Sequence, residues 1–381
     1  MSASSPALLP QAENMITNID ATNTVSPPAV TRTAWPQPQY LPLVPLQGLH
    51  RMAWRNVGPP GGEPWLLLHG GPGSSCQPGM LRPFDLSRQW VVAPDQRGCG
   101  ASCPKGRTAG NHTAALVADM ELLREHLGLE RWSVLAGSWG TVVALAYTLA
   151  HPQRVERLVL RGAFALSRRE VGGLLLPSSR VRQSLGWGAL WPVFPGTVLP
   201  VALQRLTQLI QSGTPCVESL RAARGWGLLE TASAARSQRR SLRHAALQSP
   251  RLAASIRREW ASLRKAEKRT VARLKRPGKT RNDRNALAKF RIQAHYLRHA
   301  GFVRAGELER GVLRAARHGT PVDWIHGRFD AICPPANSRR WAALGRSVGG
   351  NVTHLEPHSG HLGHEPDMLS ALRKSVRRTL A

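Results

Sequence analysis

Three groups of residues in this 381-residue chain have types and spacings suited to nucleophilic catalysis. The first is Ala136-Gly137-Ser138-Trp139-Gly140, between an apolar run and a helical pattern. A serine on such a turn is lifted above the sheet edge, and its neighbours must be small because the turn is strained. The sequence therefore predicts Ser138 as a nucleophile, with the amide of Trp139 aimed at an oxyanion. The alternative is a serine that only caps a helix.

A glycine-rich segment follows an earlier apolar run, in the order His69-Gly70-Gly71-Pro72-Gly73. Glycines at this place let a backbone amide approach a reacting carbonyl, and a hydrolase takes its second oxyanion donor from this loop. We therefore predict that the amide of Gly71 is that donor and that His69 has a structural role. The alternative is a glycine-proline turn with no part in chemistry.

The third group is an acid and a histidine that follow Ser138 in the order that such a triad requires. Asp330 comes shortly after the predicted strand 322–326, in a loop where the acid belongs. Asp323 lies inside that strand and is the poorer candidate. The sequence therefore predicts Asp330 as the acid.

Three histidines compete for the last position, just after the predicted strand 352–355: His358, His361 and His364. Imidazoles are also common metal ligands, so a metal cluster is the rival interpretation. The expected roles are His361 as the base for the nucleophile and Asp330 as the group that orients His361. On that assignment the site needs no metal ion and no organic cofactor.

The elements that must position these groups alternate between strands and helices. Strand-like apolar runs occupy 65–69, 90–93, 133–136, 157–161, 322–326 and 352–355. Helical spacing of apolar residues covers 114–127, which Gly128 closes, and 139–150. This alternation predicts an α/β fold with a mostly parallel sheet flanked by helices.

The segment 166–310 has a different character, because strand patterns vanish and Ala, Leu, Arg and Gln dominate. Residues 231–290 carry 18 Lys or Arg against three acids. We therefore predict an inserted basic helical cap over 166–310. The core is then formed by 41–165 and 311–381, after a disordered tail over residues 1–40.

The cap contains an amphipathic pattern. Its apolar stripe consists of Leu252, Ile256, Trp260 and Leu263, and the basic residues off the stripe are Arg257, Arg258, Arg264 and Lys265. A solvated helical face explains this pattern. The alternatives are binding of nucleic acid or an anionic surface, and steering of an acidic substrate.

The composition limits the classes of protein. The net charge is +29, and 45 of the 52 basic residues are Arg. An arginine-rich enzyme explains this charge as well as a nucleic-acid binder does, and we expect no nucleic-acid partner. No uncharged apolar run of about 18 residues occurs, which excludes a membrane span. The five scattered cysteines include no pair of CxxC motifs, so they suit a reducing compartment better than zinc or disulfides. With no secretory signal pattern, we expect a cytoplasmic protein.

Together these motifs resemble the prolyl aminopeptidases, or proline iminopeptidases, of the α/β-hydrolase fold. The resemblance covers roughly 41–165 and 285–381. It rests on HGGPG at 69–73, DQRGCG at 95–100, NHT at 111–113, GRFDAICP at 327–334 and SGHLGHEP at 359–366. In that family the SGH segment carries the catalytic histidine and the Gly-Arg-Phe-Asp segment carries the acid, which implies His361 and Asp330. The first glycine of the family's G-x-S-x-G is Ala136 here.

The resemblance weakens in the cap, where family members hold the substrate's free α-ammonium with two glutamates. Their W-x-x-W-E motif is similar to Trp226 through Glu230, with Leu229 in place of the second Trp. Their R-I-E-x-H-Y motif matches 291–296, except that Gln293 replaces the Glu. The resemblance therefore implies Glu230 and Gln293 as substrate-binding residues. We expect a weaker amine anchor, because a hydrogen bond to a charged group contributes about 1.5–3 kcal/mol and a neutral one about 0.5–1.5 kcal/mol.

The sequence thus predicts a serine hydrolase, and the resemblance implies an aminopeptidase that releases N-terminal proline through an acyl-enzyme on Ser138. One alternative is an esterase or amidase with the same triad and an altered cap. Another is a basic nucleic-acid-binding protein on a hydrolase scaffold, against which the intact set of Ser138, Asp330 and His361 argues. The expected partner is a peptide or a small amide or ester, and not a membrane.

Overall fold

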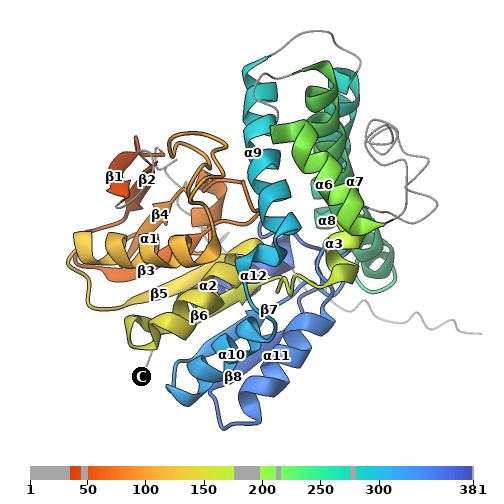
Figure 1. The fold of residues 1–381 in the computed structure, drawn as a ribbon. Helices are drawn as coiled ribbons and strands as arrows, with labels where there is room; N and C mark the ends of the chain where they lie inside the picture. The colour runs from red at the N-terminus through yellow and green to blue at the C-terminus, as the bar shows by residue number, and fades with distance from the viewer. Residues whose placement is uncertain (1–34, 44–49, 176–197, 212–215, 275–279, 380–381) are drawn as a thin grey trace, which may run out of the picture. The chain divides into compact units, whose positions relative to one another are not determined.

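A computed structural model of the chain describes residues 35–43, 50–175, 198–211, 216–274 and 280–379. Within these residues eight strands form one sheet, in the order β1-β2-β4-β3-β5-β6-β7-β8 (Figure 1). Their bounds are β1 (Gln39–Leu43), β2 (His50–Val57), β3 (Glu63–Leu68), β4 (Gln89–Pro94), β5 (Trp132–Gly137), β6 (Val155–Arg161), β7 (Val322–Ile325) and β8 (Val352–Leu355). Strand β2 pairs antiparallel with β1 and β4, and the other neighbours are parallel. The predicted mostly parallel α/β sheet is confirmed.

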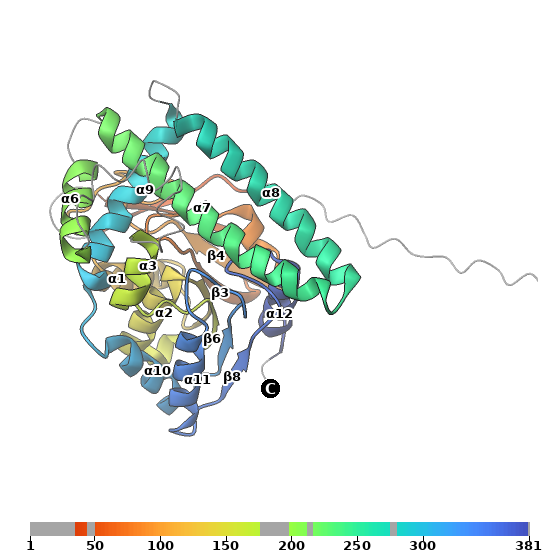
Figure 2. The same ribbon diagram turned by 90° about the vertical axis from the view of Figure 1, so that its right-hand side faces the viewer.

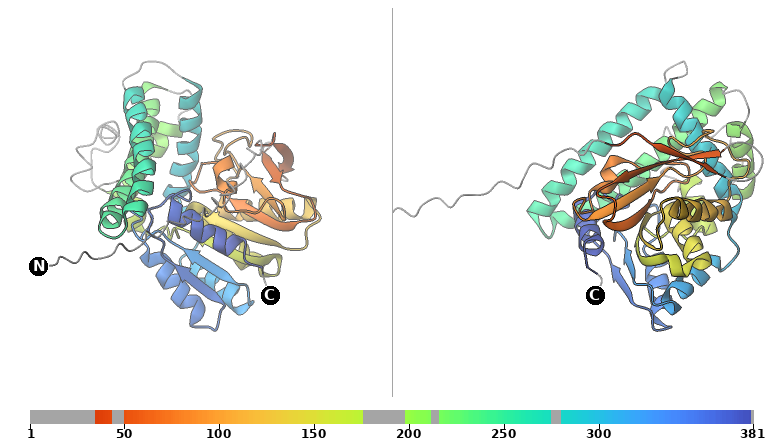
Figure 3. Two further views of the ribbon diagram at one scale, coloured as in Figure 1. Left: turned by 180° about the vertical axis from the view of Figure 1, so that it is seen from behind. Right: turned by 90° about the vertical axis from the view of Figure 1, so that its left-hand side faces the viewer.

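Helices cover both faces of this sheet. Those of the sheet-flanking layers are α1 (Thr113–His126), α2 (Trp139–Ala150), α10 (Glu307–Arg317), α11 (Ala336–Arg346) and α12 (Pro366–Val376). Helix α12 lies on the face opposite to α1 and α2, as the views from the front and from behind show (Figures 1 and 3). Short 3-10 turns lie at Pro78–Leu81, Pro152–Arg154 and Ala300–Phe302.

The central elements are apolar along their whole length because they are covered on all sides. Every residue of β5 is buried, which is typical of a parallel strand with helices on both faces. Helix α2 is buried from Trp139 to Thr148, since it packs between the sheet, α1 and α10. The predicted helices at 114–127 and 139–150 correspond to α1 and α2 within one residue.

Between β6 and α10, the described part of the chain forms helix α3 (Arg168–Leu175) and four further helices that we call the cap helices. They are α6 (Leu199–Gln211), α7 (Val217–Ala246), α8 (Pro250–Leu274) and α9 (Arg281–Arg298). Helices α7 and α8 run side by side as a long pair, and α6 and α9 pack beside α7 (Figure 2). Ile256 of the predicted apolar stripe packs on Ala245 of α7, whereas Arg257 and Arg258 are exposed.

The predicted cap limit at 310 and the predicted tail over 1–40 both overlap elements of the core. Helix α10 begins at Glu307, so the predicted cap limit at 310 falls inside a helix that packs on α2 and α11. We therefore propose that the cap ends before Glu307. The predicted tail over 1–40 lies outside the described residues up to 34, and residues 39–40 belong to β1.

No helix in the described part of the chain combines the length and the apolar character that crossing a membrane requires.

Candidate active site

Ser138 lies on the tight turn between β5 and α2, in a backbone conformation that is rare for a residue with a side chain. Its φ is 55° and its ψ is −124°. Holding a residue in this strained region costs about 1–3 kcal/mol of stability, so the surrounding structure must impose the conformation. The Ser138 amide donates to the carbonyl of Arg161 at 2.9 Å. A Cβ on Gly140 would lie 2.7 Å from the carbonyl oxygen of Leu68, so only glycine lets α2 approach β3 this closely. The turn therefore projects Ser138 from the carboxyl end of β5.

The predicted oxyanion loop lies next to this turn. A Cβ built on Gly70 would be 3.3 Å from the Cβ of Ser138, and Gly71 has a φ of +125° that favours glycine. The amide of Trp139 belongs to the first turn of α2, where backbone N–H groups have no acceptor within the helix. The loop that carries Gly71 is thus next to Ser138, and the role of the Gly71 and Trp139 amides as oxyanion donors stays a prediction.

His69 is a structural residue of this loop. Its ring is buried, and its Nε2 accepts a hydrogen bond from the amide of Gln96 at 3.0 Å. The Gln96 side chain donates to the carbonyl of His69, also at 3.0 Å, and accepts from the indole of Trp139. Burial lowers the pKa of His69, which keeps the ring neutral.

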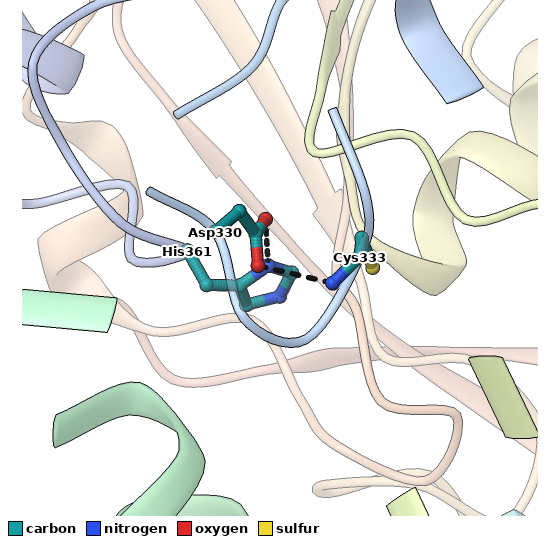
Figure 4. A group of neighbouring side chains, drawn as sticks. All are labelled: Asp330, Cys333 and His361. Atoms are coloured by element: carbon teal, nitrogen blue, oxygen red, sulfur yellow. Dashed lines mark hydrogen bonds and ion pairs between the residues drawn. The ribbon is translucent and has the colours of Figure 1, made fainter. Parts of the chain in front are cut away.

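Asp330 and His361 form a buried pair at the carboxyl ends of β7 and β8 (Figure 4). The Nδ1 of His361 lies 2.7 Å from Oδ2 of Asp330. The other carboxylate oxygen accepts the amides of Ile332 at 2.8 Å and Cys333 at 3.0 Å. Burial by itself would raise the pKa of Asp330, but His361, together with His326, holds it well below its usual range. The carboxylate is therefore ionised and fixes the orientation of the His361 ring through Nδ1.

The other candidates occupy different environments. The Nε2 of His358 lies 2.8 Å from the carbonyl of Ser241 on α7, so this ring joins the cap to the core. His364 lies 3.4 Å from the carboxylate of Glu259 on α8. Asp323 is buried inside β7, where its carboxylate is 3.2 Å from Arg378.

A cavity of about 730 Å³ opens over the carboxyl ends of the strands. Ser138 and His361 line it from the core, together with Gly70 and Gly71. Cap residues of α7, α8 and α9 line the other side: Glu230, Thr231, Ala234, Leu263, Ala266, Lys289 and Gln293. A crevice at this end of a parallel sheet is the usual place for a ligand in α/β proteins.

Comparison with known proteins gives a consistent result. The family model for the alpha/beta hydrolase fold matches residues 63–367. A proline iminopeptidase from Xylella fastidiosa (strain 9a5c) is 31% identical over 325 residues, which are 85% of this chain and 91% of that protein. One from Xanthomonas citri is 30% identical over 353 residues, 91% of this chain and 98% of that protein. The chain belongs to the proline iminopeptidase family.

Among solved structures, esterase E22 matches 90% of this chain and 98% of its own, with a TM-score of 0.55 and 15% identity. At that identity the likeness concerns the α/β-hydrolase fold alone.

In this member of the proline iminopeptidase family, charged and polar cap residues meet at the cavity. Glu230 on α7 lies 2.5 Å from the ammonium of Lys289 on α9 and accepts a hydrogen bond from Gln293 at 2.7 Å. Trp226, one turn before Glu230, stacks on Phe290 at 4.8 Å and fixes α7 against α9. The structure thus brings Glu230 and Gln293 together, and it adds Lys289, which the sequence analysis did not single out.

Two other motifs of the family hold the cap helix α9 on the core. The hydroxyl of Tyr296 donates to Asn111 at 2.6 Å, and the ring of His295 lies 2.7 Å from the carbonyl of Asn111. In the DQRGCG segment, Arg97 makes a buried bidentate pair with Asp119 at 2.6 and 2.7 Å. These contacts therefore support α9 and the loops near the cavity.

Several buried groups around His361 were also missed from the sequence. The Nε2 of His326 lies 3.4 Å from Asp330, and the guanidinium of Arg161 donates to the carbonyl of His361. Glu365 accepts the amides on either side of His361, those of Gly360 at 2.7 Å and Leu362 at 2.9 Å. Burial raises the pKa of Glu365 to about 7. The signal that could have found Glu365 is its place in the SGHLGHEP motif.

Cys333 is the thiol of this cluster. It is fully buried, three residues after Asp330, and Figure 4 shows it beside the Asp330–His361 pair. Burial raises its pKa well above the usual range, the charge of Asp330 adds to this, and a hydrogen bond with the Ser138 side chain opposes it. Within the described residues, one group has ligand atoms close enough to hold a metal ion: Asp330, Cys333 and His361. The cluster of His358, His361 and His364 that the sequence left open is not such a group.

The loops that carry Asp330 and His361 touch at Gly327, and this contact gives a testable prediction. A Cβ at Gly327 would overlap the carbonyl oxygen of Gly360. We expect Gly327→Ala to lower the free energy of unfolding by about 1–3 kcal/mol, since the backbone must move to relieve the overlap. It should also lower kcat, because the movement separates His361 from Asp330. Urea unfolding and kcat on 4-nitrophenyl acetate measure both effects.

The matched control is Gly173→Ala in α3, where a Cβ meets no described atom within 4 Å. This change should leave kcat unaltered and raise stability by about 0.5–1 kcal/mol, because alanine favours the helix. Equal stability of Gly327→Ala and the wild type would contradict the predicted contact.

Proposed function

We propose that this chain is a serine hydrolase that releases N-terminal proline from peptides through an acyl-enzyme on Ser138. The observation that carries the proposal is the Asp330–His361 pair, 2.7 Å apart, at the cavity that Ser138 lines. Membership of the proline iminopeptidase family supports the substrate class.

The chemistry proceeds in two steps. The hydroxyl oxygen of Ser138 attacks the scissile carbonyl while Nε2 of His361 takes the hydroxyl proton. His361 then gives this proton to the nitrogen of the leaving peptide, and Asp330 stabilises the imidazolium in between. A water molecule, activated by the same imidazole, attacks the prolyl ester and releases free proline and Ser138.

The negative charge that develops on the carbonyl oxygen needs donors that are already in place. We assign this role to the amides of Gly71 and Trp139. Removing one such donor in a serine hydrolase typically lowers kcat by about 10² to 10³. No step requires a metal ion or an organic cofactor.

We assign the substrate's secondary ammonium to the cap residues Glu230 and Gln293. Glu230 provides the carboxylate of this part of the cavity. The Oε1 of Gln293 is buried and has no hydrogen-bond partner among the described residues, so it can accept one N–H of the ammonium.

An esterase or amidase of altered specificity is the second candidate. The observation that favours it is the neutral state of the anchor, because Lys289 compensates the charge of Glu230. Such an enzyme uses the same triad on acyl groups without a free amine.

The proposed partners are peptides or small amides and esters, in the cytoplasm. We propose no nucleic-acid partner, because the off-stripe residues of α8, such as Arg257 and Arg258, have the exposure of an ordinary solvated face.

The test is hydrolysis of L-proline 4-nitroanilide beside N-acetyl-L-proline 4-nitroanilide and 4-nitrophenyl acetate. The proposal expects turnover of the free-amine anilide that is lost in Ser138→Ala. Turnover of the ester alone would favour the second candidate. Activity on every substrate that survives Ser138→Ala would refute both.

A further inference from the structure

The ammonium of Lys289 forms an ion pair with Glu230, the carboxylate that we assign to the substrate's amine. We propose that Lys289 is a specificity-determining residue, an internal competitor that the substrate amine must displace from Glu230. This inference rests on the proposed function, since it concerns the amine of that substrate. In this role Lys289 affects how strongly a free-amine substrate binds, and it takes no part in the chemical step.

The backbone of Lys289 is held firmly against the core. A Cβ on Gly73 would overlap the carbonyl oxygen of Lys289, so α9 rests directly on the glycine loop that carries Gly71. A Cβ on Gly106 would lie 3.0 Å from the Cα of Ala288, one residue earlier. The Cα of Lys289 is therefore fixed relative to the catalytic centre.

The side chain of Lys289, in contrast, is free to move. It is 30% exposed, and its long aliphatic stem allows the ammonium to leave the carboxylate for solvent. In the structure the ammonium lies 2.5 Å from Glu230 and 4.7 Å from the centre of the Phe290 ring. Both contacts are of the kind that another cation can replace.

The acceptors around Lys289 are arranged for a ligand with more than one N–H. Gln293 is 1% exposed, and its amide nitrogen already donates to Glu230. Gln293 is one of the residues that line the cavity, and its buried Oε1 has no hydrogen-bond partner among the described residues. A prolyl ammonium has two N–H groups, so it can donate one to Gln293 and the other to Glu230 once Lys289 has moved.

The other charged residues of the cavity offer the substrate ammonium no second carboxylate in the described lining. In the described lining, Glu230 is the acidic residue, whereas Arg82, Arg161 and Lys289 are basic. With Lys289 in place the Glu230 carboxylate is neutralised, and an incoming ammonium must compete with the lysine for it. Without Lys289, the Glu230 carboxylate keeps its hydrogen bond from Gln293 but lacks this counter-ion, so it attracts the substrate ammonium and not a neutral N-acetyl group.

The experiment compares Lys289→Met with the wild type on L-proline 4-nitroanilide and N-acetyl-L-proline 4-nitroanilide. We expect the ratio of kcat/KM for the free amine to that for the N-acetyl substrate to rise about ten- to a hundredfold, the usual size of a charge-assisted hydrogen bond. The change should be in KM. Lys289→Arg keeps the charge and should restore the wild-type ratio.

The matched control is Lys268→Met, on the exposed side of α8 and away from the cavity lining, which should leave the ratio unchanged. An unchanged ratio in Lys289→Met overturns the inference. An equal loss on both substrates also overturns it, because Lys289 would then serve the fold and not the selectivity.

A binding measurement separates this inference from the proposed function. If the wild type cleaves 4-nitrophenyl acetate but neither anilide, the proposed function fails. Calorimetric binding of L-prolinamide to the Ser138→Ala chain, with and without Lys289→Met, then decides the inference. Binding that is about ten- to a hundredfold tighter without the lysine supports it, and equal binding overturns it.

Discussion

Replacing Ser138 with alanine is expected to lower kcat by about 10⁶, the size of the loss when a serine hydrolase loses its nucleophile. The reason is that the acyl-enzyme cannot form without the Ser138 oxygen, whereas the oxyanion donors and the cavity remain. The variant should fold, because alanine keeps the Cβ that lies beside Gly70. The measurement is kcat on 4-nitrophenyl acetate and L-proline 4-nitroanilide.

Ser133→Ala is the matched control for this result. Ser133 lies on the same strand β5, it is buried, and its hydroxyl has no partner among the described residues. We expect wild-type kcat from this variant. A fluorophosphonate should label the wild type and Ser133→Ala at Ser138 and leave Ser138→Ala unlabelled. A Ser138→Ala chain with wild-type turnover would exclude Ser138 as the nucleophile.

Asp330→Asn should lower kcat by about 10⁴, with little change in KM. Asparagine has the same shape, so its side-chain oxygen can still accept the amides of Ile332 and Cys333. It carries no charge, however, and it can turn an N–H toward Nδ1 of His361, which places the ring in the wrong tautomer. The imidazolium of the transition state then also lacks its counter-ion. Steady-state kinetics on the two substrates named above provides the test.

Asp323→Asn distinguishes this effect from the loss of any buried carboxylate. Asp323 lies in β7, the strand that precedes the loop of Asp330, and its partners are Arg378 and Thr353. Its replacement should reduce stability but leave kcat of the folded enzyme intact. Equal kcat losses in the two variants would mean that Asp330 acts through the fold alone.

Local patterns in the sequence predicted the six strands from β3 to β8 and suggested the candidates for the triad, whereas β1 and β2 were missed. Strands such as β5 are short, continuously apolar runs because both faces are covered, and this pattern is visible without tertiary information. Since parallel strands end at one edge, Ser138, Asp330 and His361 could be expected to meet there from their positions after strands. Among the three histidines, His361 was assigned through the resemblance of its motif to a known family.

The charge state of the amine anchor depends instead on contacts that no local pattern encodes. Glu230 and Lys289 are 59 residues apart on different helices, and their pairing follows from how α7 packs against α9. The same holds for Arg161, which donates to the carbonyl of His361, a residue 200 positions away in the sequence. Side chains on exposed helices carry no periodic signal for their distant partners. For this reason the sequence predicted a carboxylate at Glu230, and the packed cap revealed that an internal ammonium already neutralises it.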